Sequence, residues 1–114
     1  MTTRKTLAFA GDLHPVVTSG QRHITIRKYR AGAHDFVTGE IIDGVFAGHE
    51  KPVALRIIGD TDIRMAGEVS PPYCRADGFR SRREMIEQMK RYYPGFNDET
   101  EVGLVFFELA DQAA

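Results

Sequence analysis

The stretch GQRHITIR, residues 20–27, decides the fold of this 114-residue chain. Its second half alternates apolar and polar side chains, and β-branched residues such as Ile24, Thr25 and Ile26 favour extended backbone. We therefore predict a half-buried strand over residues 24–29. Both isoleucines should face the core, and Thr25 and Arg27 should face away from it.

Further short strands are expected on either side of this one. A short apolar run at 7–10 is followed by a brief helix at 13–19, and extended segments are predicted at 41–46, 53–58 and 63–69. Gly59-Asp60 should break the chain between the last two segments. Pro71-Pro72 should end regular pairing, because proline cannot donate to a strand ladder. The run at 102–109 is apolar on both alternating faces, which is typical of a central strand.

One helix is predicted over residues 81–92. Ser81-Arg82-Arg83-Glu84 fits a capping box, and Pro94-Gly95 ends the segment. Between these signals, apolar residues follow at helical spacing. They are Met85, Ile86, Met89 and Tyr92 or Tyr93. We interpret this stripe as core rather than as a cofactor site.

These elements predict an α+β fold, a small mixed β-barrel with a covering helix at about 81–92. Many short strands must bury their faces in a curled sheet, and the helix can cover one opening. At 114 residues and 12.8 kDa, a second core would leave each half too small to offset its own ordering entropy. We therefore expect a single domain over residues 1–114.

The composition excludes several classes of protein. With 42% hydrophobic and 27% charged residues, neither disorder nor a coiled coil is indicated. No apolar run approaches the roughly 20 residues that span a bilayer, so we expect a cytoplasmic protein without membrane association. Cys74 is the only cysteine, which excludes an intrachain disulfide and predicts a small buried side chain. The histidines lack metal-ligand spacing, and no phosphate-binding glycine loop occurs, so we expect no metal and no cofactor.

The net charge of −1 removes the simple argument that a basic chain binds nucleic acid. The basic residues are nevertheless clustered. One cluster holds Arg22, Arg27, Lys28 and Arg30, and the other holds Arg80, Arg82, Arg83, Lys90 and Arg91. Together they could form one anion-facing patch, or they could be ordinary solvated faces of a strand and a helix. The clusters alone leave both interpretations open.

Residues 20–27 resemble the ASCH signature G-x-K-x-x-x-x-R, and in particular its bacterial acetylcytidine amidohydrolase branch, where the strand reads I-T-I-R. Further matches follow in the expected order. They are Phe36-Val37-Thr38-Gly39-Glu40, Asp77-Gly78-Phe79, Tyr93-Pro94-Gly95 and Phe106-Phe107-Glu108. The resemblance covers a core of about 13–109. It implies a PUA-like barrel with a cleft beside residues 20–27, and ligands such as RNA, a nucleotide or a modified nucleoside.

The chain departs from the amidohydrolase pattern at the positions that carry chemistry. The family's lysine, threonine and glutamate positions hold Arg22, Thr25 and, with a one-residue shift, Asp77. Arginine stays protonated under essentially all conditions, so Arg22 cannot act as a base or nucleophile. In a catalytic site, Asp77 or His23 would have to activate Thr25, with Arg22 holding an oxyanion. Arg22 and Thr25 also point to opposite faces of an unbroken strand, so the strand must begin after Arg22 or carry a bulge.

A binding site makes better use of the same side chains. Arg22 and Arg27 offer planar donor forks to a phosphate or a base edge, with Thr25 beside them, and Tyr29 or Tyr73 could stack on a base. We therefore favour an ASCH/PUA-like domain that binds RNA, a nucleotide or a modified nucleoside.

Other interpretations stay open from the sequence. One is a small hydrolase using Thr25, either acylcytidine amidohydrolase-like or ribonuclease-like, and another is a protein-interaction module without a nucleic-acid ligand. The site residues can also be explained by structure alone. Thr25 could simply favour extended backbone, and Arg27 could form an ion pair with Asp60 or Asp62. Asp77 could stabilise the positive N-terminal end of the helix that follows it. The sequence does not decide the oligomeric state.

Overall fold

One five-stranded sheet carries the fold of residues 4–110, the part of the chain that the computed structural model describes. In chain order the elements are β1 (Thr6–Phe9), a 3-10 turn at Gly11–Leu13, α1 (His14–Thr18), β2 (Ile24–Lys28), β3 (Ile41–Phe46), β4 (Val53–Met65), a 3-10 turn at Ala66–Glu68, α2 (Pro71–Ala76), α3 (Arg82–Tyr92) and β5 (Glu101–Leu109). The strand order is β1-β3-β4-β5-β2. Only β1 and β3 run parallel, so the sheet is mixed, as predicted.

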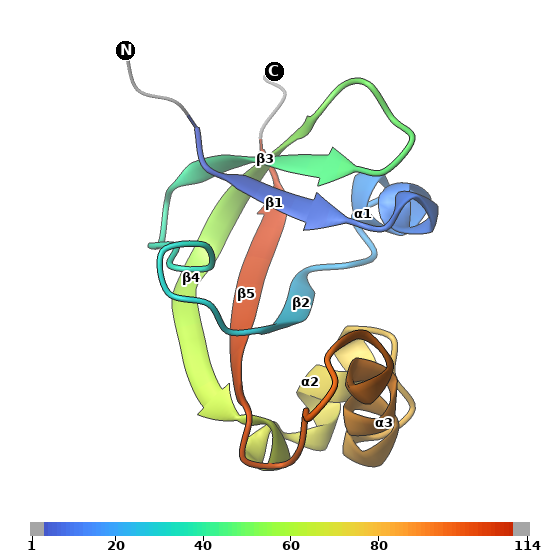
Figure 1. Ribbon diagram of the computed structural model, residues 1–114. Coiled ribbons are helices and arrows are strands. Elements are labelled where there is room, and N and C mark those ends of the chain that lie inside the picture. The colour runs from blue at the N-terminus through green and yellow to red at the C-terminus, as the bar shows by residue number, and fades with distance from the viewer. Residues whose placement is uncertain (1–3, 111–114) are drawn as a thin grey trace.

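The sheet curls but does not close. In Figure 1, β1 and β3 cross the upper end of the long strands β4 and β5, while α2 and α3 lie together below. The two edge strands are β1 and β2, and no backbone pairing joins them within residues 4–110. The predicted α+β class, mixed sheet and covering helix are confirmed. The barrel is open along the seam between β1 and β2.

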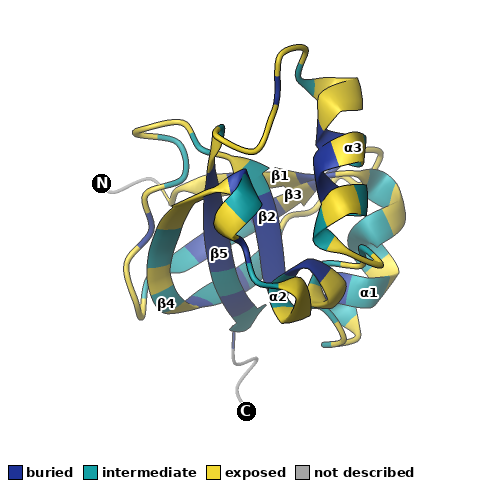
Figure 2. Cartoon of the chain, turned by 90° about the horizontal axis from the view of Figure 1, so that it is seen from below, coloured by how far each residue is buried: buried dark blue, intermediate teal, exposed yellow. Residues whose placement is uncertain are grey.

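Curling gives the sheet two separate apolar cores. Inside the curl, Phe9 of β1 packs edge-on against Phe107 of β5 at 5.8 Å, although two strands separate β1 from β5 in the sheet. The other core lies under α2 and α3 and includes Val102 and Leu104 of β5. Figure 2 shows β2 and β5 buried along most of their length. Strand β5 is therefore a central strand with both faces covered, as its sequence predicted.

Alternate side chains of strand β2 point toward different cores. Ile24 and Ile26 are buried in the core under the helices, which confirms the prediction. Thr25 lies on the opposite face and pairs with Val105, a residue of the inner core. That face was expected to be solvated, but it lines the inside of the curl, so Thr25 is only 5% exposed.

The predicted break at Gly59-Asp60 is wrong, because β4 continues through it as one strand of 13 residues. Its pairing with β5 shifts register between Ile57 and Gly59 and again between Gly59 and Asp62. Bulges of this kind bend a strand and increase its twist without ending it. The glycine therefore marks the point where the sheet bends rather than a turn between two strands.

The helix predicted over 81–92 is confirmed as α3. The Ser81 hydroxyl accepts a hydrogen bond from the Glu84 backbone N–H at 3.1 Å, and Met85, Ile86 and Met89 are buried. Helix α2 was not predicted. Strand pairing already ends at Met65, so Pro71-Pro72 does not end it as predicted. The two prolines open a helix instead, since a proline in the first helical turn withholds an N–H that has no partner there.

Candidate functional site

Two adjacent cavities lie along the open seam of the sheet. The first, which we call the Thr25 cavity, has a volume of about 670 Å³ and is lined by Arg22, β2, the Asp77-Gly78-Phe79 turn and the end of α3. The second, the Lys28 cavity, has a volume of about 590 Å³ and is lined by β1, the end of β2 and the loop that follows it. Ala8, Arg27 and Tyr93 line both cavities, so they form the boundary that the two cavities share.

Asp77 connects the turn after α2 to Arg22 and to strand β2 by hydrogen bonds. Its Oδ1 accepts a hydrogen bond from Arg22 Nη1 at 3.0 Å, and its Oδ2 accepts one from the Ile26 backbone N–H at 3.0 Å. Strand β2 begins at Ile24, so Arg22 precedes it and is free to turn toward the cavity that Thr25 lines. Asp77 is the C-cap of α2, and the N-terminus of the next helix, α3, is capped by Ser81.

The Arg22–Asp77 ion pair is largely buried, with side chains 17% and 9% exposed. Burial raises the pKa of Asp77 to about 6, against the opposing effects of the Ile26 N–H and of Arg22 and Arg27. The desolvation of the carboxylate therefore outweighs its favourable contacts. The carboxyl of Asp77 therefore titrates near pH 6 rather than near its usual pKa of 3.8.

Arg27 crosses the seam from β2 toward β1. Its Nε donates to Thr25 Oγ1 at 2.9 Å, and its guanidinium lies 5.0 Å from the centre of the Phe9 ring. Burial lowers the pKa of Arg27. The sequence offered Asp60 or Asp62 as an ion partner for Arg27, but Asp60 accepts from Thr38 and Asp62 pairs with Arg64.

The structure distributes the remaining sequence candidates differently. Tyr29 lines the Lys28 cavity, where its hydroxyl donates to Asp35 Oδ1 at 2.6 Å. Tyr73 packs edge-on against Phe106 at 5.5 Å and lines neither cavity. His23, the alternative base, also lines neither cavity. Arg22, Thr25, Arg27 and Asp77 are therefore the candidates that share one cavity.

Sequence reasoning missed the aromatic wall of the Thr25 cavity. Tyr92, Tyr93 and Phe79 line it, and Tyr92 is 75% exposed. The helical spacing placed Tyr92 or Tyr93 in the buried stripe of α3. Tyr93 does pack against the core and is partly buried, whereas Tyr92 is exposed. The available signal was the spacing itself, because Tyr92 and Tyr93 are consecutive residues and only one of them can continue the stripe from Met89.

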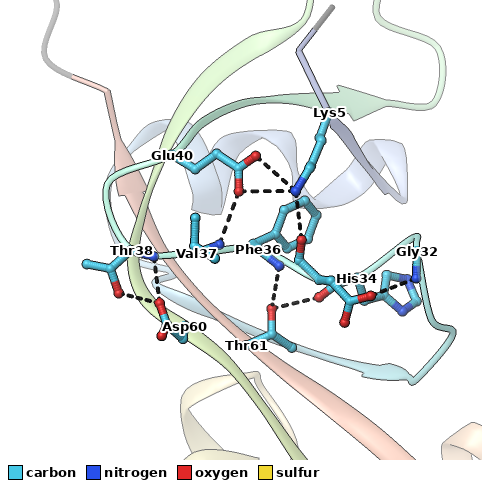
Figure 3. Close-up of polar contacts among 10 residues, drawn as sticks. Lys5, Gly32, His34, Phe36, Val37, Thr38, Glu40, Asp60 and Thr61 are labelled. Atoms are coloured by element: carbon cyan, nitrogen blue, oxygen red, sulfur yellow. Dashed lines mark hydrogen bonds and ion pairs between the residues drawn. The ribbon is translucent and has the colours of Figure 1, made fainter.

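Hydrogen bonds hold the loop between β2 and β3 against β4 and β1. The Thr61 hydroxyl donates to the His34 carbonyl at 2.6 Å and accepts from the Phe36 N–H at 3.1 Å. Figure 3 shows these contacts together with those of Lys5, which donates to the Asp35 carbonyl at 2.9 Å. The loop wall of the Lys28 cavity is thus anchored at both sides.

A metal site, a membrane-spanning helix and a reactive cysteine each require particular features of the described residues. No group of three or more His, Cys, Asp or Glu side chains within residues 4–110 could hold a metal ion. Over the same residues, no helix is long and apolar enough to cross a membrane. Cys74 is buried, as predicted, and burial raises the pKa of its thiol, which disfavours the reactive thiolate.

Gly78 gives a direct test of how Arg22 is held. Its φ of +93° favours glycine, and a Cβ there would lie 2.8 Å from Arg22 Nη2. We expect Gly78→Ala to lower the free energy of unfolding by about 1–2 kcal/mol from backbone strain, and to displace the Arg22 side chain as well. Urea denaturation measures the loss of stability, and the pKa of Asp77 measured by NMR reports the displaced guanidinium.

Gly95 provides the matched control for this substitution. Its φ is +89°, but a Cβ there would meet no heavy atom within 4 Å. Gly95→Ala should therefore show the strain without any change at Asp77. An unchanged Asp77 pKa in Gly78→Ala would mean that the Gly78 turn does not position Arg22.

The fold has known counterparts among solved structures. A protein of Enterococcus faecalis V583 assigned to the family DUF984 superimposes with a TM-score of 0.71 at 18% identity, covering 97% of this chain and 78% of that one. The ASCH domain from Lactobacillus crispatus JV V101 gives 0.69 at 12% identity, covering 92% and 79%. Hypothetical protein PH0355 gives 0.64 at 15% identity, covering 95% and 100%.

Sequence comparison adds no closer relationship. No protein-family model matches the chain, and no curated protein matches it either. The structural likenesses, at 12–18% identity, show the fold alone. That fold is ASCH-like, as the signature in residues 20–27 implied.

Proposed function

We propose that this chain binds a nucleotide, or a nucleotide unit of RNA, with the base in the Thr25 cavity. The observation that carries the proposal is the convergence of Arg22, Arg27 and Asp77 on one cavity with an aromatic wall. Recognition of single-stranded RNA relies on hydrogen bonds to base edges and on stacking against aromatic side chains. The cavity offers both kinds of contact.

The polar groups match the edge of a nucleobase. Arginine forks donate to ring nitrogens and carbonyl oxygens, while a carboxylate accepts from an exocyclic amino group. Arg22 and Asp77 are already paired at 3.0 Å, so a donor and an acceptor lie side by side. Such a pair supports recognition of a base that presents an acceptor next to an amino group.

The exposed ring of Tyr92 supports stacking at the mouth of this cavity. Base–aromatic stacking contributes about 1–3 kcal/mol per base. An aromatic side chain that is 75% exposed has surface available for a ligand, whereas Tyr73 is committed to Phe106. Tyr92 therefore takes the stacking role for which the sequence suggested Tyr29 or Tyr73.

The surroundings of Thr25 favour binding over hydrolysis. The Thr25 hydroxyl accepts a hydrogen bond from Arg27, a permanent cation that cannot remove its proton. Arg22, at the lysine position of the amidohydrolase pattern, is equally unable to act as a base. A nucleophilic threonine needs an adjacent base, and neither arginine provides one.

A small hydrolase is the second candidate, and Asp77 is the observation that favours it. A carboxyl with a pKa of about 6 is suited to general acid–base catalysis near neutral pH. In this reading Asp77 accepts a proton from Thr25 or from water, while Arg22 and Arg27 stabilise the developing oxyanion. The substrate class would be an acylated cytidine or RNA, in line with the resemblance to the amidohydrolase branch.

One experiment separates the two candidates. Purified protein is titrated with ribonucleosides, their monophosphates, acylated cytidines and short single-stranded RNAs, with binding followed by NMR and products by chromatography. We expect saturable shifts at the Thr25 and Ile26 amides without product. Turnover that is lost in Thr25→Val, with the fold intact, would instead establish the hydrolase.

The Arg22→Lys variant sharpens the comparison, because it restores the lysine of the amidohydrolase pattern. Product formed only by this variant would mark the chain as a binding domain on a hydrolase scaffold. If no member of the panel binds or reacts, the nucleotide proposal fails, and a protein-interaction module stands in its place.

A further inference from the structure

The wall of the Lys28 cavity is positively charged. Its lining residues include Lys5, Arg27, Lys28 and Arg30, and none of the lining residues is an aspartate or a glutamate. One carboxylate lies behind the wall, since Asp35 accepts hydrogen bonds from the lining residues Tyr29 and Gly32. A concave surface lined by one sign of charge focuses the field and concentrates the opposite ion. The whole chain has a net charge of −1, so this concentration of cations is local.

Two of these cations, Lys28 and Arg30, are not paired with a carboxylate of the described residues. Within residues 4–110, Arg27, Lys28 and Arg30 take part in no ion pair, whereas Lys5 pairs with Glu40 at 3.1 Å. Lys28 instead holds its ammonium 5.4 Å from the centre of the Tyr93 ring. Lys28 and Arg30 are thus two cations beside one cavity that form no ion pair, whereas Arg27 also interacts electrostatically with Asp77. Cations without an ion-pair partner favour an anionic ligand.

His34 adds a polar group to the same cavity. Its imidazole is among the lining residues, and the Nδ1 atom is buried without a hydrogen-bond partner within residues 4–110. Buried polar atoms almost always have a partner, so this nitrogen calls for an explanation. Thr61 fixes the His34 backbone, as Figure 3 shows, so the loop holds this ring at the cavity wall.

We infer that the Lys28 cavity is a phosphate subsite, which holds the phosphoryl group of the nucleotide whose base occupies the Thr25 cavity. This inference rests on the proposed function. Arg27 lines both cavities, so it lies between the base and the phosphate. The phosphoryl group can belong to a mononucleotide or to the phosphodiester of an RNA, and both present the same anionic oxygens.

The test compares each nucleoside with its phosphorylated forms. Affinities are measured by calorimetry for the four ribonucleosides, their 3′- and 5′-monophosphates and the dinucleoside monophosphates. We expect the wild-type protein to prefer a phosphorylated form by about tenfold or more, since each charged hydrogen bond contributes that much. The 3′ and 5′ arms and the dinucleoside arm distinguish a terminal phosphate from a phosphodiester.

The variant Lys28→Ala/Arg30→Ala should reduce this preference to near one and leave the affinity for nucleosides unchanged. Both side chains are exposed, so the fold should tolerate their loss. The matched control is Lys51→Ala/Arg83→Ala, which removes the same charge from exposed residues that line neither cavity. It should keep the phosphate preference.

Each contrary outcome has a distinct meaning. Equal wild-type affinity for nucleosides and their phosphates would overturn the phosphate subsite and leave the base site standing. An equal loss of preference in the control variant would also overturn it, because the effect would then be one of overall charge. Absence of binding by every compound would overturn both the subsite and the proposed function.

Discussion

Replacing Asp77 with asparagine is expected to remove about 2 kcal/mol of pH dependence from the free energy of unfolding between pH 4.5 and pH 7.5. Burial raises the pKa of Asp77 from its usual 3.8 to about 6. Between these two values the folded chain binds more protons at this site than the unfolded chain does. The contribution of Asp77 to stability therefore falls as the pH rises through this window, and asparagine abolishes the fall.

Urea denaturation of the wild type and Asp77→Asn at half-unit steps from pH 4.5 to pH 7.5 measures this effect. The difference between the two curves isolates Asp77, because other carboxylates titrate in both proteins. Asp60 provides a control of opposite sign, since hydrogen bonds from Thr38 lower its pKa, and its contribution is lost as the pH falls. Parallel curves for the wild type and Asp77→Asn would contradict the raised pKa.

The direction of the Asp77 pKa shift also bears on function. The raised pKa means that folding favours the protonated form of Asp77 over the ionised form, even though Arg22 and the Ile26 N–H contact the carboxylate. A buried ion pair is often less favourable than an apolar pair of the same shape. Perturbed carboxylates inside cavities are accordingly candidates for a functional role.

The sequence predicted the elements whose patterns are local. Ile24 and Ile26 alternate with period two, and Ser81 with Glu84 caps a helix, so β2 and α3 follow from neighbouring residues. The continuity of β4 through Gly59 does not, because β5 supplies the pairing that carries the strand past the glycine. Likewise, Thr25 is buried because the whole sheet curls, which no short window of sequence contains.

The candidate site likewise contains residues that the sequence grouped correctly and residues that it could not group. The resemblance grouped Arg22, Thr25 and Asp77, and the structure places all three around one cavity, while their function stays a prediction. Tyr92 and the Lys28 cavity could not be grouped with them from the sequence. Their places depend on the seam between β1 and β2, two edge strands that meet only after the chain has wound through β3, β4 and β5.

The largest loss of ligand binding is expected for Arg22→Ala/Arg27→Ala. If both guanidinium groups donate to the base edge, removing them should weaken the binding of a nucleoside about a thousandfold, at about 1.5–3 kcal/mol for each charged hydrogen bond. Because a nucleoside is uncharged and the arginines are largely buried, this loss should persist at high salt. Calorimetric titration in low and high salt measures it, with urea denaturation to confirm that the variant folds.

Lysine substitutions at the same positions decide whether charge or directed donation matters. Arg22→Lys and Arg27→Lys keep the positive charge but lose the planar fork that donates two parallel hydrogen bonds. Each should therefore weaken nucleoside binding about tenfold. Lysine variants that bind as well as the wild type would show that the cavity attracts its ligand by charge alone. In that case Asp77 would have no acceptor role, since a site that works by positive charge gains nothing from a carboxylate within 3.0 Å of its arginine.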